Sequence, residues 1–320
     1  MIDTPAPPSR MPVWLALAAA AAIGMMTAVP ARVNGQLGIR LEDGFVAAVV
    51  SFGSGLVLLV VASAILPAGR GGFGRLVTGV RTRGIPWWML AGGAAGALTV
   101  ATQGLAVGII GVSLFTVGIV AGQTVSGLLL DRIGFGPAGV VAVTVPRLLG
   151  GECQRAAVGL ALAGDGLAEV PLWMLVLPFL SGIAIAWQQA TNGRLRQRVG
   201  TPLTATLVNF AGGSILLLIA ALVHVAIVGP PQPFPTELWL YVGGALGVVY
   251  IFLSAAIVQY TGVLLLGLGA VVGQLLMSVV LDALWPAPAT PGLAQELAMV
   301  TVALASVVVA AVPWRRRRAR

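Results

Sequence analysis

Two glutamines and two aspartates recur at matching positions in the two halves of the sequence. Gln123 follows a glycine inside an apolar run that Asp131 closes, and Gln274 follows a glycine inside a second run that Asp282 closes. The same offset separates the two glutamines and the two aspartates, which indicates a tandem duplication. A buried amide must find hydrogen-bond partners, and a solute in a cavity can supply them. The repeated pattern therefore predicts polar solute contacts within an apolar protein.

The composition is that of an integral membrane protein. The 320 residues are 58% hydrophobic and 9% charged, and the mean hydropathy is +1.00. A soluble globular domain carries about 25% charged residues. Apolar runs of about 20 residues favour transmembrane helices over barrel strands, which alternate over roughly 10 residues.

The basic residues are all arginines, and few of them lie inside the apolar runs. The net charge of +8 is typical of a membrane protein whose arginines hold loops in the cytoplasm and touch anionic lipid. We therefore expect no nucleic-acid partner, and anionic lipid at the arginine-rich C-terminus. A single cysteine, Cys153, excludes an intramolecular disulfide. No motif suggests catalysis, so we predict that the protein is not an enzyme and uses no cofactor or metal.

Ten apolar segments divide the chain. We predict spans at about residues 11–29, 45–66, 86–107, 112–130, 148–163, 172–190, 203–228, 238–258, 263–281 and 293–312. The fifth contains polar residues and leaves open a segment that does not span, which would give nine helices. The predicted units are residues 12–163 and 172–312, with a linker at 164–171, an N-terminal tail at 1–11 and an arginine-rich tail at 313–320. The first run could pass for a signal peptide, but Gly24 aligns with Gly182 of an interior span, so we treat it as a retained helix.

Five spans per unit force the second unit to enter the membrane upside down. With the N-terminus inside, every arginine except Arg32, Arg40 and Arg155 falls on the cytoplasmic side, as the positive-inside rule requires. The predicted fold is an all-α integral membrane protein of ten transmembrane helices, arranged as two inverted five-helix repeats. It lies in the inner membrane with both termini cytoplasmic. Such repeats can exchange conformations and open a central cavity to each side in turn.

Candidate solute contacts follow from depth. A helix rises about 1.5 Å per residue, so a glutamine eight residues from a helix end lies roughly 12 Å deep, near the middle of a hydrocarbon core of about 30 Å. Gln123 and Gln274 are therefore the first candidates, although each could instead tie neighbouring helices together. The further candidates on the pathway are Ser126, Gln103, Ser254 and Asn209.

Four residues are candidate gates. Asp131 and Asp282 end their helices, where an aspartate opposes the helix dipole, so each is either a latch that pairs with an arginine or a solvated helix end. Asn34 and Asn192 each precede a glycine near the end of the first span of a unit. They are either C-terminal caps or polar groups at the cavity mouth.

Several motifs match a known family. They are Asn34-Gly35, Phe52-x-x-Gly55, Pro86-Trp-Trp-x-x-x-Gly-Gly-x-x-Gly96 and the Gly-Gln pair with its aspartate. The chain resembles the bacterial YdcZ-like inner-membrane family of the drug/metabolite transporter superfamily. Members of that family are often one five-helix unit, whereas this chain resembles two fused in tandem. The resemblance implies transport or efflux of a small metabolite.

Together these observations predict an inner-membrane exporter of a small metabolite or drug-like solute, which works by alternating access around a midplane cavity. The alternative from another class is a non-transporting membrane scaffold or a lipid-interacting accessory protein. A membrane enzyme is third, because no paired catalytic groups are present. The oligomeric state stays open, with a monomer plausible.

Overall fold

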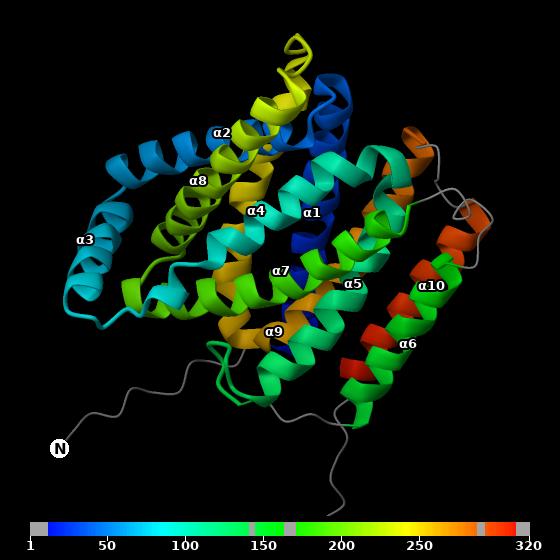
Figure 1. Cartoon of the computed structure of the whole chain (residues 1–320). Coiled ribbons are helices and arrows are strands. Elements are labelled where there is room, and N and C mark those ends of the chain that lie inside the picture. Colours follow the sequence, from blue (N-terminus) through cyan, green and yellow to red (C-terminus); the bar gives the residue numbers. More distant parts are fainter. Residues whose placement is uncertain (1–11, 141–144, 163–170, 287–291, 312–320) are drawn as a thin grey trace, which may run out of the picture.

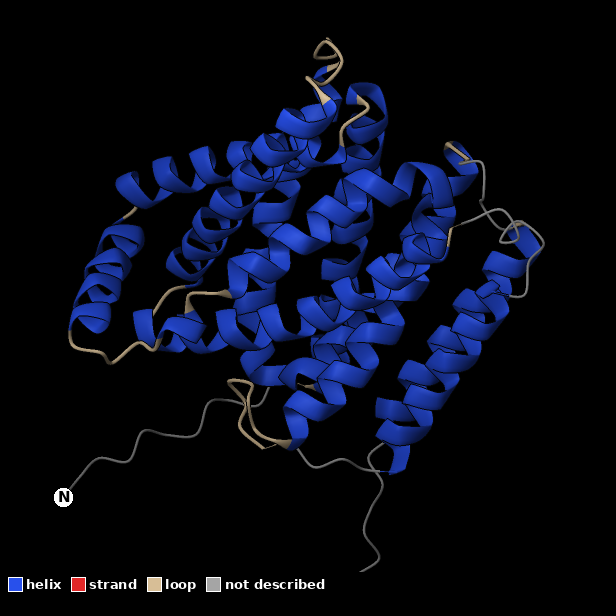
Figure 2. Cartoon of the chain, viewed as in Figure 1, coloured by secondary structure: helices blue, strands red, loops and turns tan. Residues whose placement is uncertain are grey.

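The computed structural model describes residues 12–140, 145–162, 171–286 and 292–311. These residues form a bundle of helices, and no strand occurs among them (Figures 1 and 2). The α-helices are α1 (Val13–Leu41), α2 (Gly44–Ile65), α3 (Pro67–Arg81), α4 (Gly92–Thr102), α5 (Gly108–Arg132), α6 (Val145–Leu162), α7 (Leu172–Val199), α8 (Pro202–Val228), α9 (Gly243–Leu284) and α10 (Leu293–Ala311). Short 3-10 helices, η1 (Trp87–Met89) and η4 (Leu238–Tyr241), precede α4 and α9, and a π-helical turn, η2 (Gln103–Val107), joins α4 to α5. The two predicted tails and most of the predicted linker lie outside the described residues.

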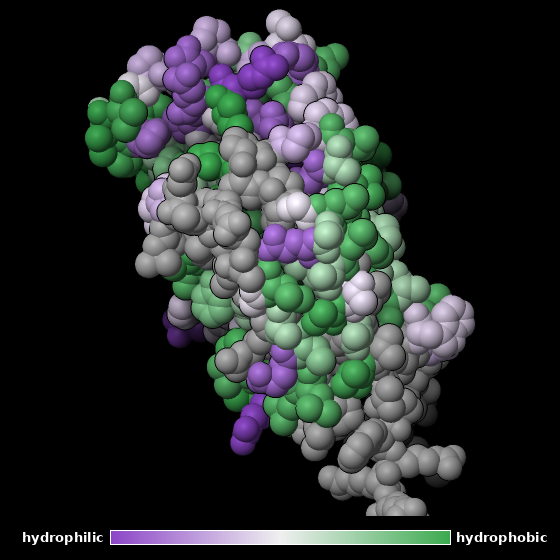
Figure 3. All heavy atoms as spheres, turned by 90° about the vertical axis from the view of Figure 1, so that its right-hand side faces the viewer, coloured by the Kyte–Doolittle hydropathy of each residue, from purple (hydrophilic) through white to green (hydrophobic). Residues whose placement is uncertain are grey.

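The bundle presents an apolar exterior. By length and composition, five segments of the described chain can cross a membrane: Trp14–Leu41, Gly44–Ile65, Trp87–Arg132, Pro202–Val228 and Leu238–Thr261. A shorter apolar helix covers Gly269–Leu284. Figure 3 shows hydrophobic residues over much of one face, with hydrophilic residues gathered mainly toward its top. Such an apolar surface is compatible with the hydrocarbon of a membrane, whereas in water it would favour association.

The first helix of each unit is longer than predicted. α1 continues to Leu41 and α7 to Val199, so Asn34 and Asn192 lie inside helices. Their interpretation as C-terminal caps was therefore wrong. The C-cap of α1 is instead Glu42, in the left-handed conformation, and the C-cap of α7 is Gly200.

The arginine-rich segment between the second and third predicted spans is a helix, α3. Pro67 occupies the first turn of α3, where its fixed φ suits a helix start and no N–H is needed. Gly69 and Gly72 are buried against α2 and α8. The Arg75 Nε donates to the carbonyl oxygen of Val199 at 2.6 Å and so caps the end of α7. This helix ties three elements together at one end of the bundle.

The long helix α9 doubles back along α1. Its first residue, Gly243, lies against Asn34 near the end of α1, whereas Gly269 lies against Ala20 near the start of α1. Trp285, just beyond α9, accepts a hydrogen bond from Arg32. A straight helix cannot meet both ends of α1 and return, so α9 contains a reversal, which Figure 1 shows. It supplies the eighth and ninth predicted segments without a loop between them.

Glycines bring α1 and the returning part of α9 into backbone contact. A Cβ on Gly24 would overlap the carbonyl oxygen of Ala270, and one on Gly273 would overlap that of Ala21. Close approach of small residues is how helices pack in an apolar medium. Gly273 of the Gly-Gln pair is thus a helix-crossing residue.

The equivalent contact joins α5 and α7. A Cβ on Gly182 would overlap the carbonyl oxygen of Ile119, and one on Gly122 would overlap that of Phe179. These four positions match the four of the α1–α9 crossing in sequence. Each unit therefore inserts its first helix against the Gly-Gln helix of the other unit.

The helices α6 and α10 pair at one side of the bundle (Figure 1). The side-chain Nε2 of Gln295 donates to the carbonyl oxygen of Leu160 at 2.6 Å. The fifth predicted segment is thus helical, although Val145–Leu162 is not among the five spanning segments above.

Candidate functional site: a neutral cavity between the two units

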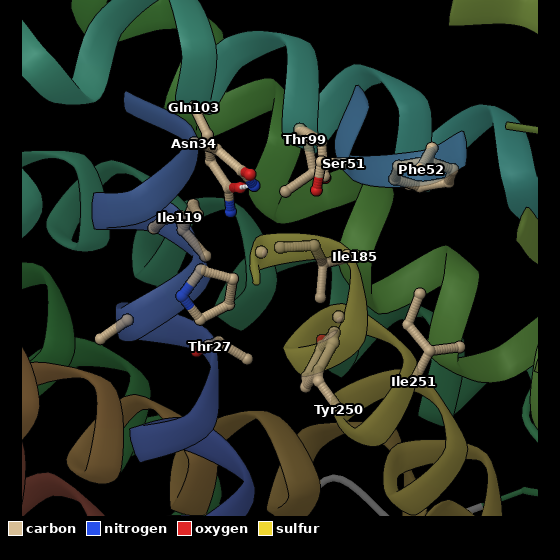
Figure 4. Close-up of a pocket in the computed structure, with 18 of the residues that line it drawn as sticks. Thr27, Asn34, Ser51, Phe52, Thr99, Gln103, Ile119, Ile185, Tyr250 and Ile251 are labelled. Carbon is tan, nitrogen blue, oxygen red and sulfur yellow. Dashed lines mark hydrogen bonds between the residues drawn. The ribbon is translucent and has the colours of Figure 1, made fainter. Parts of the chain in front are cut away.

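A cavity lies between α1, α2, α4, α5, α7, α8 and α9 (Figure 4). The space open to the centre of a water-sized sphere is about 60 Å³, several times the ~10–15 Å³ that one water needs. Both units contribute to its lining. Its polar side chains come from Thr27, Asn34, Ser51, Thr99, Gln103, Thr116, Gln188, Tyr250 and Gln274.

Gln274 enters this cavity from α9 and is held by α1. Its Nε2 donates to Thr27 Oγ1, and that hydroxyl donates to the carbonyl oxygen of Gly24 at 2.7 Å. Within the described chain, the Oε1 of Gln274 is buried and receives no hydrogen bond. A glutamine that was predicted to contact solute thus lines the cavity and keeps one buried acceptor without a donor among the described residues.

Asn34 and Gln103 form the second polar element. The Asn34 Nδ2 donates to Gln103 Oε1 at 2.8 Å, which joins α1 to the π-helical turn, as Figure 4 shows. The Asn34 Oδ1 faces the first residue of α9, Gly243, and a side chain there would collide with it. Among the described residues nothing donates to this oxygen.

Aromatic and aliphatic side chains form the rest of the wall. Phe52 of α2 and Phe210 of α8 stack with ring centroids 4.7 Å apart and an interplanar angle of 28°. Each ring packs against a glycine of the other helix, Phe52 on Gly213 and Phe210 on Gly55. The stacked pair therefore sits where equivalent helices of the two units cross.

Sequence-equivalent polar clusters are packed differently in the two units. Asn34, Ser51, Gly243 and Gly244 line the cavity, and we call them the open cluster. Their equivalents, Asn192, Asn209, Gly92 and Gly93, do not line it, and we call them the closed cluster.

Hydrogen bonds fill the closed cluster. The Asn209 Nδ2 donates to Asn192 Oδ1 at 3.3 Å, and the Gln188 Nε2 donates to Asn209 Oδ1 at 3.2 Å. Gly92 lies against Asn192 just as Gly243 lies against Asn34. The predicted candidates Asn192 and Asn209 therefore come together, but they bond to each other and to Gln188 rather than line the cavity.

Three other predicted contacts lie outside the cavity lining. Gln123 is buried, and its Oε1 receives no hydrogen bond from the described residues. Ser126 donates to the carbonyl oxygen of Ile183 at 3.4 Å. Ser254 is buried on α9. The equivalent glutamines Gln123 and Gln274 thus have different surroundings, because the position that matches Thr27 is Ile185.

The two aspartates are buried, at 1% and 2% exposed, so neither is a solvated helix end. The Asp282 carboxylate accepts the backbone N–H groups of Val112 and Ser113 at 3.2 and 2.9 Å. Gly111, with φ 80°, interrupts α5 there, a conformation that favours glycine, and the helix restarts with unpaired N–H groups. Asp131 accepts the N–H of Val263 at 3.0 Å.

In the contacts described, arginines reach the aspartate-bearing helix ends at backbone carbonyl oxygens. Arg32 donates to the carbonyl oxygen of Trp285 and interacts electrostatically with Asp282. Arg194 donates to the carbonyl oxygen of Gly134, close after Asp131. Arg132, which follows Asp131 in the sequence, is exposed.

Sequence reasoning missed Thr27 and Tyr250 as lining residues. Thr27 carries no signal in the sequence, because a threonine in an apolar helix usually bonds to its own backbone. Gln188 was detectable as half of a rare polar pair with Gln189 within an apolar span.

An apolar helical bundle with a partly polar central cavity defines a multi-pass membrane protein that can hold a small solute. The comparison with known families agrees with this class. The model DMT_YdcZ, which describes inner membrane exporters of the YdcZ type, matches residues 15–160 and 173–309. The chain therefore belongs to the YdcZ family of inner membrane transporters, as its motifs predicted, and contains two copies in tandem. No match was found among curated proteins.

Proposed function

We propose that the protein exports a small metabolite or drug-like solute by alternating access around the cavity described above. In this proposal ten spans form two inverted repeats with both termini cytoplasmic. The end of α1 and the open cluster then lie toward the outside, and the closed cluster lies toward the cytoplasm. Gln274, Gln103 and Asn34 contact the solute in the conformation described.

The observation that carries this proposal is the unequal packing of equivalent residues. Asn34 and Asn192 occupy matching positions, yet one lines the cavity and the other is sealed by Asn209. Two similar halves in different packings can exchange them, and the exchange moves the opening to the other side. Asn192, Asn209 and Gln123 are the counterparts that would line the cavity after the exchange, with Ser126 and Ser254 beside them on the pathway.

In this proposal the contacts of the aspartates and arginines stay formed during the exchange. Asp131 and Asp282 each cap a helix segment of the other unit. Buried charged contacts of this kind are costly to break. The two ends can therefore serve as pivots, while the uncharged clusters open and close.

Thiol labelling tests alternating access without knowledge of the solute. Cys153 is the single cysteine of the sequence, so Cys153→Ser provides a cysteine-free background. Ser51→Cys reports on the open cluster. Asn209→Cys reports on the closed cluster, as does Thr191→Cys, because Thr191 lies against Gly92 of that cluster. Each is exposed to a membrane-impermeant maleimide in right-side-out and inside-out vesicles.

We expect Ser51→Cys to react from outside and the closed-cluster cysteines to react, more slowly, from the cytoplasmic side. Prior labelling at Ser51→Cys should slow the reaction of Asn209→Cys in the double variant, because the two openings exclude each other. Labelling of all three from one side would contradict alternation. Unreactive closed-cluster cysteines in both vesicle types would favour the scaffold function instead.

A further inference from the structure

We infer that the cavity selects an uncharged solute that has an apolar body and at least one N–H or O–H donor group. This inference rests on the proposed function, because it names the chemical class of the transported solute. It follows from three properties of the cavity: two free acceptors, no charged side chain and aromatic walls.

The first free acceptor has a fixed orientation. The Thr27 hydroxyl has one hydrogen, and it gives this hydrogen to the carbonyl oxygen of Gly24. Thr27 Oγ1 can then only accept from Gln274, so the amide nitrogen of Gln274 must face Thr27. The Oε1 of Gln274 is left as an acceptor, and the residue is 6% exposed.

The second free acceptor is the Oδ1 of Asn34. The Asn34 Nδ2 is already used by Gln103, and the residue is 1% exposed. A buried carbonyl oxygen without a donor costs about 1–3 kcal/mol. A solute that brings a donor to either oxygen removes that cost, whereas a solute with acceptors alone does not.

The described residues that line the cavity include no Asp, Glu, Lys, Arg or His. A charged solute that entered the cavity would lose its hydration and would find no side chain of opposite charge. Burial of such an unpaired ion is far more costly than burial of a neutral group. The nearby carboxylate of Asp282 is already occupied by Val112 and Ser113. The cavity thus disfavours both cations and anions.

The walls define the body of the solute. Phe52, Phe115, Phe210 and Tyr250 surround the polar groups, together with Ile119 and other aliphatic side chains. Aromatic walls favour a flat apolar group through stacked or edge-on contacts. A neutral amide or alcohol with an aromatic or aliphatic body, and without an amine, fits this combination.

Four probes share a phenyl group and differ only in the head group, so they separate the effect of charge from the effect of N–H donors. Phenylacetamide is neutral and has N–H donors, and N,N-dimethylphenylacetamide is neutral without them. Phenylethylammonium is a cation, and phenylacetate is an anion. Binding of each to the purified full-length protein in detergent is measured by isothermal calorimetry, and flux of each is measured in proteoliposomes.

We expect phenylacetamide to bind best, and loss of its donors to weaken binding roughly tenfold, the usual value of one buried hydrogen bond. Gln274→Leu should cause a similar loss for phenylacetamide alone. Gln274→Glu keeps the shape but adds a charge, and should shift the preference toward phenylethylammonium. Gln259→Leu is the matched control, because Gln259 lies on the same helix outside the cavity, and it should leave all four affinities unchanged.

Equal or tighter binding of the dimethyl amide, the cation or the anion to the unaltered protein would overturn the inference. Binding of none of the four would overturn it as well. Neither outcome touches the thiol-labelling result, on which the proposed function stands or falls independently.

Discussion

Asp282, near the end of α9, accepts two hydrogen bonds from Ser113 of α5, one from the backbone N–H at 2.9 Å and one from the hydroxyl at 2.7 Å. Asp131 makes the matching contact with the N–H of Val263 at 3.0 Å. Each aspartate therefore caps a helical segment that belongs to the other unit. A residue that is unfavourable at the end of its own helix is favourable at the start of a neighbouring one.

Substitution of Asp282 tests this capping role. We expect Asp282→Ala to lower the free energy of unfolding by about 2–3 kcal/mol, because charge-assisted hydrogen bonds are lost. Asp282→Asn should cost less than half of this, since asparagine is also a good N-cap. Thermal unfolding of the purified protein in detergent measures both. An asparagine variant as unstable as the alanine variant would show that the charge, rather than the cap geometry, holds the two units together.

The helix-crossing glycines permit a matched pair of substitutions. Gly24→Ala places a methyl group on the backbone of Ala270, so α1 and α9 must separate. We expect a loss of at least 1–3 kcal/mol, as for an overpacked core, and a clear fall in the yield of folded protein. Gly53→Ala in α2 meets nothing within 4 Å and should be neutral or slightly stabilising. Size-exclusion profiles and melting temperatures of the two variants provide the comparison, and equal behaviour would contradict the crossing.

The sequence aligned the crossing glycines of the two units, but it did not indicate which helices they bring together. The repeat aligns Gly24 with Gly182, and the structure shows that both meet the backbone of a neighbouring helix, where only glycine fits. The Asn-Gly pairs were misinterpreted, since that dipeptide is also the usual sign of a helix end. In the structure Gly35 lies against Val107, where a Cβ would be 2.9 Å from the valine Cβ. One residue type serves both purposes, and only the tertiary contact distinguishes them.

The cavity could be predicted only in part for a similar reason. Helix rise fixes how deep a residue lies, so Gln123 and Gln274 were expected at similar depth. Rotation about the helix axis decides which of them faces the cavity, and a helix that is apolar on all sides carries no sign of its orientation. The structure brings Gln274 to the cavity with Asn34 and Gln103 and leaves Gln123 outside.

The contact between Arg32 of α1 and the end of α9 yields a further prediction. Arg32 is 6% exposed and donates to the carbonyl oxygen of Trp285. We expect Arg32→Met to cost about 1–3 kcal/mol, because a partly buried hydrogen bond from a charged donor is lost. Arg40→Met on the same helix is the control. Arg40 forms an exposed ion pair with Glu237 at 3.4 Å, and such pairs contribute about 0–1 kcal/mol. Equal losses of melting temperature in the two variants would argue against the Arg32 contact.

The orientation of the chain yields the last prediction. A proline-rich loop at 229–235 follows α8. The N–H of Gln232 in this loop donates to the carbonyl oxygen of Leu41 at 2.9 Å, so the loop lies at the same end of the bundle as the end of α1. The exposed arginines of α3, Arg70 and Arg81, should lie at the cytoplasmic surface, where basic residues collect. Reporters fused after Arg320 or inserted after Arg83 should therefore read cytoplasmic, and a reporter inserted after Gln232 should read periplasmic. A periplasmic signal after Arg320 would leave one unit with an even number of spans, and the two units could then no longer be inverted copies of each other.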